Sequence, residues 1–396
     1  MAATPLTVTN AVLADGTLTS LRIVDGLVAA HGVEAQPGDV VLDADGGLVL
    51  PAMAEAHAHL DKAFLSETVP NPTGDLIGAI VAMEDHRHLI PAADTEVRAE
   101  RAARLLAAHG ATAIRTHADV TTGNGMMSVA ALLAVRERLG DLVHIEVMAL
   151  GGWPVCGAAG AEQRALLREA VAMGVDGIGG CPHLEDDETG AVDALLDMAA
   201  DAGLPLDLHT DEHLDTGRST LAHLAHRVAG GFPHRVAASH AVSLVMRPEA
   251  EQRETAAALA AAGVSVIALP ASNLFLQGRD HPIGTPRALA PARLLLDAGV
   301  NLAAGWDNLQ DPFNPVGRGD CLETAALMVM AGHLLPHDAY HCVSNATRHV
   351  IGLPTAGTSI GDAADLVVLR SAGVRAAIAE APAARTVVRG GRVVGR

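Results

Sequence analysis

Residues 51–62 read Pro-Ala-Met-Ala-Glu-Ala-His-Ala-His-Leu-Asp-Lys, and this stretch decides the fold. It continues an apolar run that begins at Leu48, which predicts one buried strand from Leu48 to His59. Alternate residues of a strand face the same side, so His57 and His59 can share one ion. The stretch therefore predicts a strand that carries a metal site at its carboxyl end.

Beyond this strand the chain alternates between short apolar runs and Ala-, Leu-, Glu- and Arg-rich stretches with helical spacing. We expect seven further strands, at residues 111–117, 144–150, 176–180, 204–209, 235–240, 264–269 and 300–306. Helices are expected between them, among others at 96–109, 161–173, 191–202 and 249–262. Eight strands with intervening helices predict an α/β protein of the (β/α)8 TIM-barrel type.

Both ends of the chain read as short strands joined by turns. The candidate strands are 6–8, 21–24 and 40–42 near the start, and 364–369 and 386–394 near the end. We predict one small β-sandwich domain built from both termini. Residues 1–50 form its first part, residues 51–352 the barrel, and residues 353–396 its second part.

Composition narrows the class of protein. The net charge of −19 disfavours binding to phosphate backbones or anionic membranes by general electrostatics, so we expect neither nucleic acid nor membrane as a partner. Residues 1–10 lack a signal-peptide pattern, and no apolar stretch reaches the roughly 18 residues of a membrane span. The four cysteines lie far apart, which favours free thiols and a cytoplasmic location.

Polar residues gather where the predicted strands end, which is where barrel enzymes carry their chemistry. His57, His59, His209 and Asp307 offer three imidazoles and a carboxylate, a set that suits one Zn²⁺ or Fe²⁺ with a position left for water. Such a metal lowers the pKa of its water toward neutrality. Glu212 can pass a proton between water and substrate, while Asp307 and His240 can hold and deprotonate the water.

Each of these residues also has a structural interpretation. The chain has 20 histidines, and any single one is more often a core or surface residue than a ligand. The ligand hypothesis rests on the joint placement of several polar residues at strand ends. His183 and His213 also fall at the predicted barrel mouth, but the metal does not need them. His117 and Asp119 follow the second strand without an assigned role.

At these residues the sequence resembles the amidohydrolase superfamily, and within it the cytosine deaminase-like branch. The resemblance is carried, in order along the chain, by residues 51–62, 115–120, 182–185, 209–212, 239–240, 276–279 and 307–313. It implies that His57, His59, His209 and Asp307 bind the metal, that Glu212 shuttles protons and that His240 orients the water. Many members bridge two metals with a carboxylated lysine on the fourth strand. Lys62 is the only lysine here and follows the first strand, so one divalent metal is expected.

The departures from the family concern the substrate. Cytosine deaminases carry a glutamine just after the third strand, where this chain reads Leu150-Gly151-Gly152-Trp153-Pro154, and a second aspartate where it has Asn308. A tryptophan of the next loop is replaced by Phe313. These losses argue against cytosine itself, because a site built to hydrogen-bond one edge rejects analogues strongly. Three other segments, Asp61-Lys62, Asp307-Asn308 and residues 317–320, resemble the enzyme that removes the alkylamine from N-isopropylammelide. That enzyme, however, lacks a glutamate equivalent to Glu212.

Lys62 stands out because it is the only lysine in the chain, whereas arginine is frequent. We expect it to do something arginine cannot, such as binding a substrate carbonyl or anionic ring oxygen with a compact ammonium. The alternative is a buried pair with Asp61 or Glu55. The remaining pocket candidates are chosen by position: Trp153, Asn308, Phe313, Leu276 and Gln277.

The leading hypothesis is a deaminase that hydrolyses a small oxo- and amino-substituted nitrogen heterocycle and releases ammonia. Cytosine-, isoguanine- and triazine-like rings are the candidate substrates. One alternative keeps the machinery and opens a cyclic amide or removes a substituted amine. Another is a non-catalytic metal-containing binding protein. Members of this branch often form oligomers, so a homo-oligomer is expected by analogy only.

Overall fold

The structure is a computed structural model that describes residues 4–395. Eight parallel strands follow one another in chain order around the larger domain. An isolated parallel bridge between Ala58 and Asp307 links the first strand to the segment that follows the last, so the sheet closes into a barrel. The predicted TIM barrel is therefore confirmed. Its strands are β6 (Met53–Ala58), β7 (Ala111–Val120), β8 (His144–Gly151), β9 (Gly177–Gly180), β10 (Leu206–Thr210), β11 (Val236–His240), β12 (Ser265–Ala268) and β13 (Leu302–Ala304).

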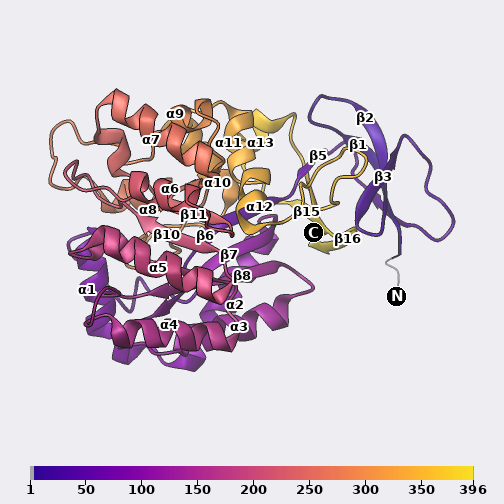
Figure 1. Cartoon of the computed structure of the whole chain (residues 1–396). Helices are drawn as coiled ribbons and strands as arrows, with labels where there is room; N and C mark the ends of the chain where they lie inside the picture. The colour runs from indigo at the N-terminus through magenta and orange to yellow at the C-terminus, as the bar shows by residue number, and fades with distance from the viewer. Residues whose placement is uncertain (1–3, 396) are drawn as a thin grey trace.

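Helices surround this barrel (Figure 1). Their limits follow local signals: α5 begins after Asp187, whose carboxylate accepts the Gly190 N–H, and ends at Gly203, which has a positive φ of 68°. The α-helices are α1 (Leu76–His86), α2 (Ala92–Ala108), α3 (Met127–Leu139), α4 (Ala161–Met173), α5 (Glu188–Ala202), α6 (Leu221–Ala229), α7 (Glu249–Ala262), α8 (Pro270–Leu276), α9 (Ala292–Asp297), α10 (Cys321–Met330), α11 (Pro336–Cys342), α12 (Asn345–Ile351) and α13 (Val374–Glu380). Short 3-10 turns cover Arg87–Leu89, Pro182–Leu184 and Ser243–Met246.

The two ends of the chain build the second domain together, and in Figure 1 the indigo and yellow segments lie side by side in it. Its sheet runs in the order β16-β15-β14-β5-β1-β2-β3, with β4 paired to β1. This confirms a small β domain made from both termini, whereas the residue limits of the domains stay a prediction. The strands are β1 (Leu6–Val12), β2 (Leu18–Val24), β3 (Leu27–His31), β4 (Val40–Asp43), β5 (Leu48–Pro51), β14 (Leu366–Leu369), β15 (Arg385–Arg389) and β16 (Arg392–Gly395).

The single strand predicted from Leu48 to His59 is wrong. Its first part is β5, which pairs with β14 in the terminal sheet, and its second part is β6, which pairs with β7 in the barrel. The chain changes sheets at Ala52, whose N–H donates to the Asp365 carbonyl. Both strands are largely buried, so the apolar run continues across the change and carries no mark of it. The predicted run 386–394 is likewise a hairpin, which turns at Gly390 and Gly391, both with positive φ.

The main hydrophobic core lies between the barrel strands and the helices around them. It is built largely from Ala, Val, Leu and Ile, as a chain with only 2% aromatic residues requires. A separate core fills the terminal domain. Within residues 4–395 no helix has the length and apolar character needed to cross a membrane.

Candidate active site

Three imidazoles converge at the carboxyl end of the barrel. The Nε2 atoms of His57 and His59 lie 3.3 Å apart, and each approaches the Nε2 atom of His209, at 3.1 and 3.3 Å respectively. The Asp307 Oδ1 atom lies 3.2 Å from His59 Nε2 and 3.6 Å from His57 Nε2. Tetrahedral ligands about 2.0–2.1 Å from a zinc ion would stand roughly 3.3 Å from one another. The donor spacing therefore fits a single metal ion.

The electrostatics of these four residues fit a cation as well. Burial, together with the neighbouring imidazoles or Lys62, lowers the pKa values of His57, His59 and His209, which keeps their lone pairs available. Burial raises the pKa of Asp307, and its Oδ1 atom has no hydrogen-bond partner within the described part of the chain. A divalent ion would satisfy this buried oxygen and the three nitrogens together. The site thus suits the predicted ligands, whose role stays a prediction.

Two of the predicted residues sit on unusual backbone. Asp307 has a φ of 72° and His240 a φ of 70°, although neither is glycine. The Asp307 carbonyl accepts the His59 N–H at 3.1 Å, which ties the metal-facing end of β6 to the segment after β13. Backbone in this left-handed region costs about 1–3 kcal/mol for an ordinary residue and clusters at functional sites. The strain here places two side chains over the barrel mouth.

A buried relay supports His57 from below. The His57 Nδ1 atom donates to the Ser239 hydroxyl at 2.9 Å, and that hydroxyl donates to Asp207 Oδ1 at 2.6 Å. This arrangement leaves the lone pair of His57 on Nε2, which faces the other imidazoles. The other oxygen of Asp207 accepts from Arg115 at 2.9 Å, and Arg115 also pairs with Glu146 at 2.7 Å. The relay is thereby anchored in the middle of the barrel.

His117 packs against the metal-binding group without facing its centre. Its ring centroid lies 4.0 Å from that of His57, and its Nε2 atom lies 3.6 Å from Asp207 Oδ2. The arrangement of His57, His117 and Asp207 could also hold a cation, although the Asp207 oxygens already accept from Arg115 and Ser239. We therefore assign His117 and Asp207 to the support of His57.

Glu212 follows β10 and reaches the cavity from beside His209. Its Oε1 atom lies 3.5 Å from His240 Nδ1, and its Oε2 atom lies 3.8 Å from His183 Nε2. Burial, and then the charge of Asp307, raise the pKa of Glu212 well above its usual range. Burial lowers the pKa of His240 to about 4. The raised pKa favours the protonated form of the Glu212 carboxyl and the lowered pKa favours the neutral form of His240, an arrangement suited to proton donation by the carboxyl.

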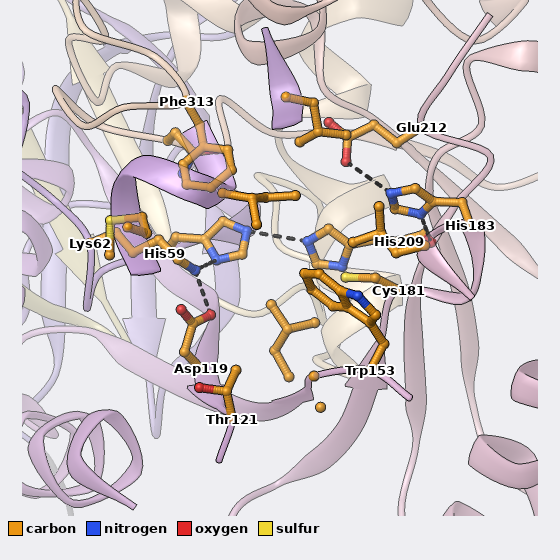
Figure 2. A pocket seen from close by; sticks show the side chains of 18 of the residues that line it. His59, Lys62, Asp119, Thr121, Trp153, Cys181, His183, His209, Glu212 and Phe313 are labelled. Carbon is orange, nitrogen blue, oxygen red and sulfur yellow. Dashed lines mark hydrogen bonds and ion pairs between the residues drawn. The ribbon is translucent and has the colours of Figure 1, made fainter. Parts of the chain in front are cut away.

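A cavity of about 750 Å³, counting its open mouth, lies over these groups. Figure 2 shows His59, His209 and Glu212 on its wall, with Trp153 and Phe313 on the same cavity. Trp153 is 41% exposed at the mouth. The carboxylate of Glu185 accepts the Val155 N–H at 2.5 Å, which holds the loop that carries Trp153. The walls therefore combine flat apolar surfaces with a few polar atoms, as small-molecule sites do.

Lys62 lines this cavity and is also part of a buried pair. Its Nζ atom lies 2.6 Å from Asp119 Oδ1 and 3.0 Å from His59 Nδ1. Burial lowers the pKa of Lys62, but the charges of Asp119 and Asp61, together with the hydrogen bond to Asp119, outweigh it, so the pKa is raised. The buried pair considered as the alternative is formed with Asp119 rather than with Asp61 or Glu55, neither of which forms an ion pair with Lys62 among the described residues.

The other predicted pocket residues divide into two groups. Trp153, Phe313 and Asn308 line the cavity, although the Asn308 amide also donates to Asp311 at 2.8 Å. Gln277 does not line it: its amide donates to the Glu212 carbonyl at 3.1 Å, and its side chain borders an adjoining groove together with Leu276. The prediction for these two residues is corrected, since α8 turns them past the cavity.

Sequence reasoning missed one wall of the cavity. The helix α1 contributes Leu76, Ile80 and Met83 to this wall, and Arg87, which directly follows the helix, lies on it as well. No element was predicted in this region. The spacing of Leu76, Ile80 and Met83 is helical and was the available signal. His183 and Cys181, which follow β9, complete the wall. Their side chains lie within the cavity lining in Figure 2.

Comparison with known proteins gives consistent matches over most of the chain. The sequence model of the amidohydrolase family matches residues 83–395. The chain is 34% identical to a pterin deaminase of Rhizobium rhizogenes over 363 residues, which cover 89% of this chain and 82% of that protein. It superposes on a 5-methylcytosine deaminase of Klebsiella pneumoniae with a TM-score of 0.89, at 28% identity and covering 98% of both chains. It superposes on an N-isopropylammelide isopropylaminohydrolase of Burkholderia multivorans with a TM-score of 0.86, at 29% identity. That match covers 100% of this chain and 99% of the other.

Proposed function

The chain belongs to the amidohydrolase family, and from that premise we propose that it is a metal-dependent deaminase of a small oxo- and amino-substituted nitrogen heterocycle. One observation carries the proposal: the buried carboxyl of Glu212, with its raised pKa, stands beside four converging metal-ligating groups. A proton donor next to such a group is what hydrolysis of an amidine-type C–N bond requires. Two of the related proteins described above are deaminases of such rings.

A divalent metal held by His57, His59, His209 and Asp307 would supply an activated water. Glu212 gives its proton to the ring nitrogen next to the attacked carbon, recovers one proton from the water, passes it to the departing amine, and regains the second water proton as the oxo group forms. His240, 3.5 Å from Glu212, orients the attacking water. The water oxygen joins the ring carbon, the C–N bond breaks and ammonia leaves, so water and the amino heterocycle balance the oxo heterocycle and ammonia.

Among substrates we propose a pterin-type ring first, with cytosine-, isoguanine- and triazine-like rings as the other members of the class. The relative at 34% identity is a pterin deaminase. Trp153 lies in the stretch 150–154, where cytosine deaminases are expected to carry a glutamine, and with Phe313 it provides flat surface for a larger ring. Lys62 can contact a ring carbonyl from the cavity wall.

A second candidate function is removal of a substituted amine from such a ring. The solved N-isopropylammelide isopropylaminohydrolase favours it, since it covers the whole chain at 29% identity. Both functions use the same residues, so only the product separates them. A non-catalytic binding protein would leave the raised pKa of Glu212 without a use.

The finer properties are also proposals. The ligand set of three imidazoles and a carboxylate supports zinc or iron as the native metal, at one ion per chain. The four cysteines are free thiols, which supports a cytoplasmic location. Assembly into a homo-oligomer rests on analogy with the branch. Metal analysis and light scattering of the purified protein test the metal and the assembly.

The test is an ammonia-release screen of metal-analysed protein with pterin, isocytosine, cytosine, isoguanine, ammelide and N-isopropylammelide. We expect ammonia from at least one ring, and we expect Glu212→Gln to lower turnover about 10²–10⁴-fold while the bound metal stays unchanged. Release of isopropylamine without ammonia would support the second candidate. Full activity of Glu212→Gln would contradict the proposed role of this carboxyl.

A further inference from the structure

His183 lies in the short turn Pro182–Leu184 after β9, and neither the metal site nor the proton transfer described above uses it. Its side chain is only 3% exposed and lines the cavity. In Figure 2 it stands between Glu212 and His209. Its own carbonyl accepts from Arg218 at 2.9 Å, so the backbone that carries the ring is fixed.

The position of the proton on this ring follows from its contacts. The Nδ1 atom lies 2.9 Å from the His209 carbonyl oxygen, which can only accept. Nδ1 must therefore carry the hydrogen and donate, which leaves the lone pair of the neutral ring on Nε2. That Nε2 atom is buried and has no hydrogen-bond partner among residues 4–395. His183 thus presents an acceptor, and no donor, to the cavity.

The acceptor has no protein group to serve. Glu212 Oε2 is 3.8 Å away, which is beyond hydrogen-bond distance. His183 is also absent from each set of described residues that could hold a metal ion. Leaving a buried acceptor without a hydrogen bond destabilises the protein, so the arrangement is explained if a ligand supplies the missing N–H. The Glu212 carboxyl and this bare imidazole nitrogen then face the same part of the cavity.

We propose that His183 determines specificity for the leaving group, by accepting a hydrogen bond at Nε2 from the N–H of the amine that departs. The inference rests on the proposed function and adds a substrate rule to it. An amino heterocycle carries a ring nitrogen and an amine on one carbon, so Glu212 can donate to the first while His183 accepts from the second. Amines with at least one N–H satisfy this pair of groups. Alkoxy leaving groups on the same ring do not, because they have no hydrogen to donate.

The test compares two variants that differ in which ring nitrogen they imitate. In His183→Asn the side-chain amide can still donate to the His209 carbonyl, as Nδ1 does, but no atom occupies the position of Nε2. In His183→Gln the longer amide can place an oxygen near that position. Far-ultraviolet circular dichroism and metal content of both variants show whether fold and metal are retained.

The substrates are one heterocycle carrying either a methylamino or a methoxy group at the reacting carbon, since the two have the same shape and only the first has an N–H. We measure kcat/KM where the ring is turned over and the competitive inhibition constant where it is not. His183→Asn is expected to lose about tenfold or more for the methylamino ring and little for the methoxy ring, with part of the loss restored in His183→Gln. Equal losses for both rings, or none, would overturn the proposal.

These outcomes are separable from failure of the proposed function. If the wild-type protein turns over no ring, the proposed function fails. Dissociation constants for the same two rings, measured by calorimetry in wild type and His183→Asn, then still decide the role of His183. A preference for the methylamino ring that disappears in the variant supports it, and an unchanged preference contradicts it.

Discussion

Buried polar groups are treated differently at the barrel mouth and in the terminal β domain. At the mouth, atoms of His183, His209, His240 and Asp307 are buried without a hydrogen-bond partner among the described residues. In the terminal domain the buried hydroxyl of Thr7 donates to Asp39, and Arg22 binds the same carboxylate through two nitrogens. No unpartnered buried side-chain atom falls in the described ranges 4–51 and 353–395.

The difference shows which part of the molecule is built for a ligand. Each unmet buried group costs about 1–3 kcal/mol, and four together would consume much of the stability of an ordinary domain. The terminal domain avoids this cost because its polar groups serve only the fold. Under the proposed function the barrel mouth carries this cost because a metal ion would bind Asp307 Oδ1 and a substrate would meet His183 Nε2. Substitutions in each region test this difference.

The largest expected effect comes from removing a ligand at the mouth. His209→Ala should lose the bound metal and reduce turnover to background, because the remaining groups no longer surround an ion. Chelator should lower the melting temperature of the wild type but leave that of the variant nearly unchanged, because only the wild type gains stability from bound metal. Metal analysis and thermal melting with and without chelator measure both effects. A variant that keeps its metal would contradict the proposed role of His209 as a ligand.

A smaller effect is expected one step away from the metal. Ser239→Ala removes the hydroxyl that joins Asp207 to His57, and this should weaken metal binding about 10–100-fold, as loss of such support does elsewhere. Thr210→Val is the matched control, because the Thr210 hydroxyl is equally buried but donates only to the Ser239 carbonyl. Titration of the apo-proteins with Zn²⁺ gives the affinities. Equal weakening in both variants would show that any buried hydroxyl here matters, and the relay would be refuted.

The smallest effect is expected in the terminal domain. The Arg22 guanidinium, with the Gln36 N–H, holds the pKa of Asp39 well below its usual range. A depressed pKa means that the pair stabilises the fold above about pH 4 and stops doing so as the pH falls and Asp39 becomes protonated. Arg22→Gln should therefore lower the melting temperature at pH 7 and converge with wild type in acid, with turnover unchanged.

The control for this pair is Arg253→Gln, whose partner Glu249 on α7 is as exposed as the arginine itself. Exposed pairs contribute little, so this variant should melt like wild type at every pH. A fall in turnover by Arg22→Gln at 25 °C would contradict the separation of the two regions.

The four candidate metal ligands could be picked out from the sequence because their signals are local. His57 and His59 are two apart on one strand, and His209 and Asp307 follow other apolar runs, so the rule that barrel chemistry gathers at strand ends brings them together. The support of His57 was also accessible: Asp207 lies two residues before His209 on β10 and therefore faces the same way.

Other features depend on contacts that no local pattern records. The partner of Lys62 is Asp119, which is 57 residues away and reaches it only because β6 and β7 are neighbours. Gln277 was misplaced because the path of the chain after α8 decides which side of Glu212 it meets. The change of sheets at Ala52 was missed because burial makes both strands apolar.

If the unmet groups at the barrel mouth serve hydrolysis, the oxygen of the product comes from water, and turnover in ¹⁸O-labelled water tests this. With the ring that releases ammonia fastest, and with one metal ion per chain established beforehand, the product is analysed by mass spectrometry. We expect one ¹⁸O atom in each product molecule, at the carbon that lost nitrogen, and no product after the metal is removed. Product that carries no ¹⁸O, or that forms at the full rate without metal, would contradict it.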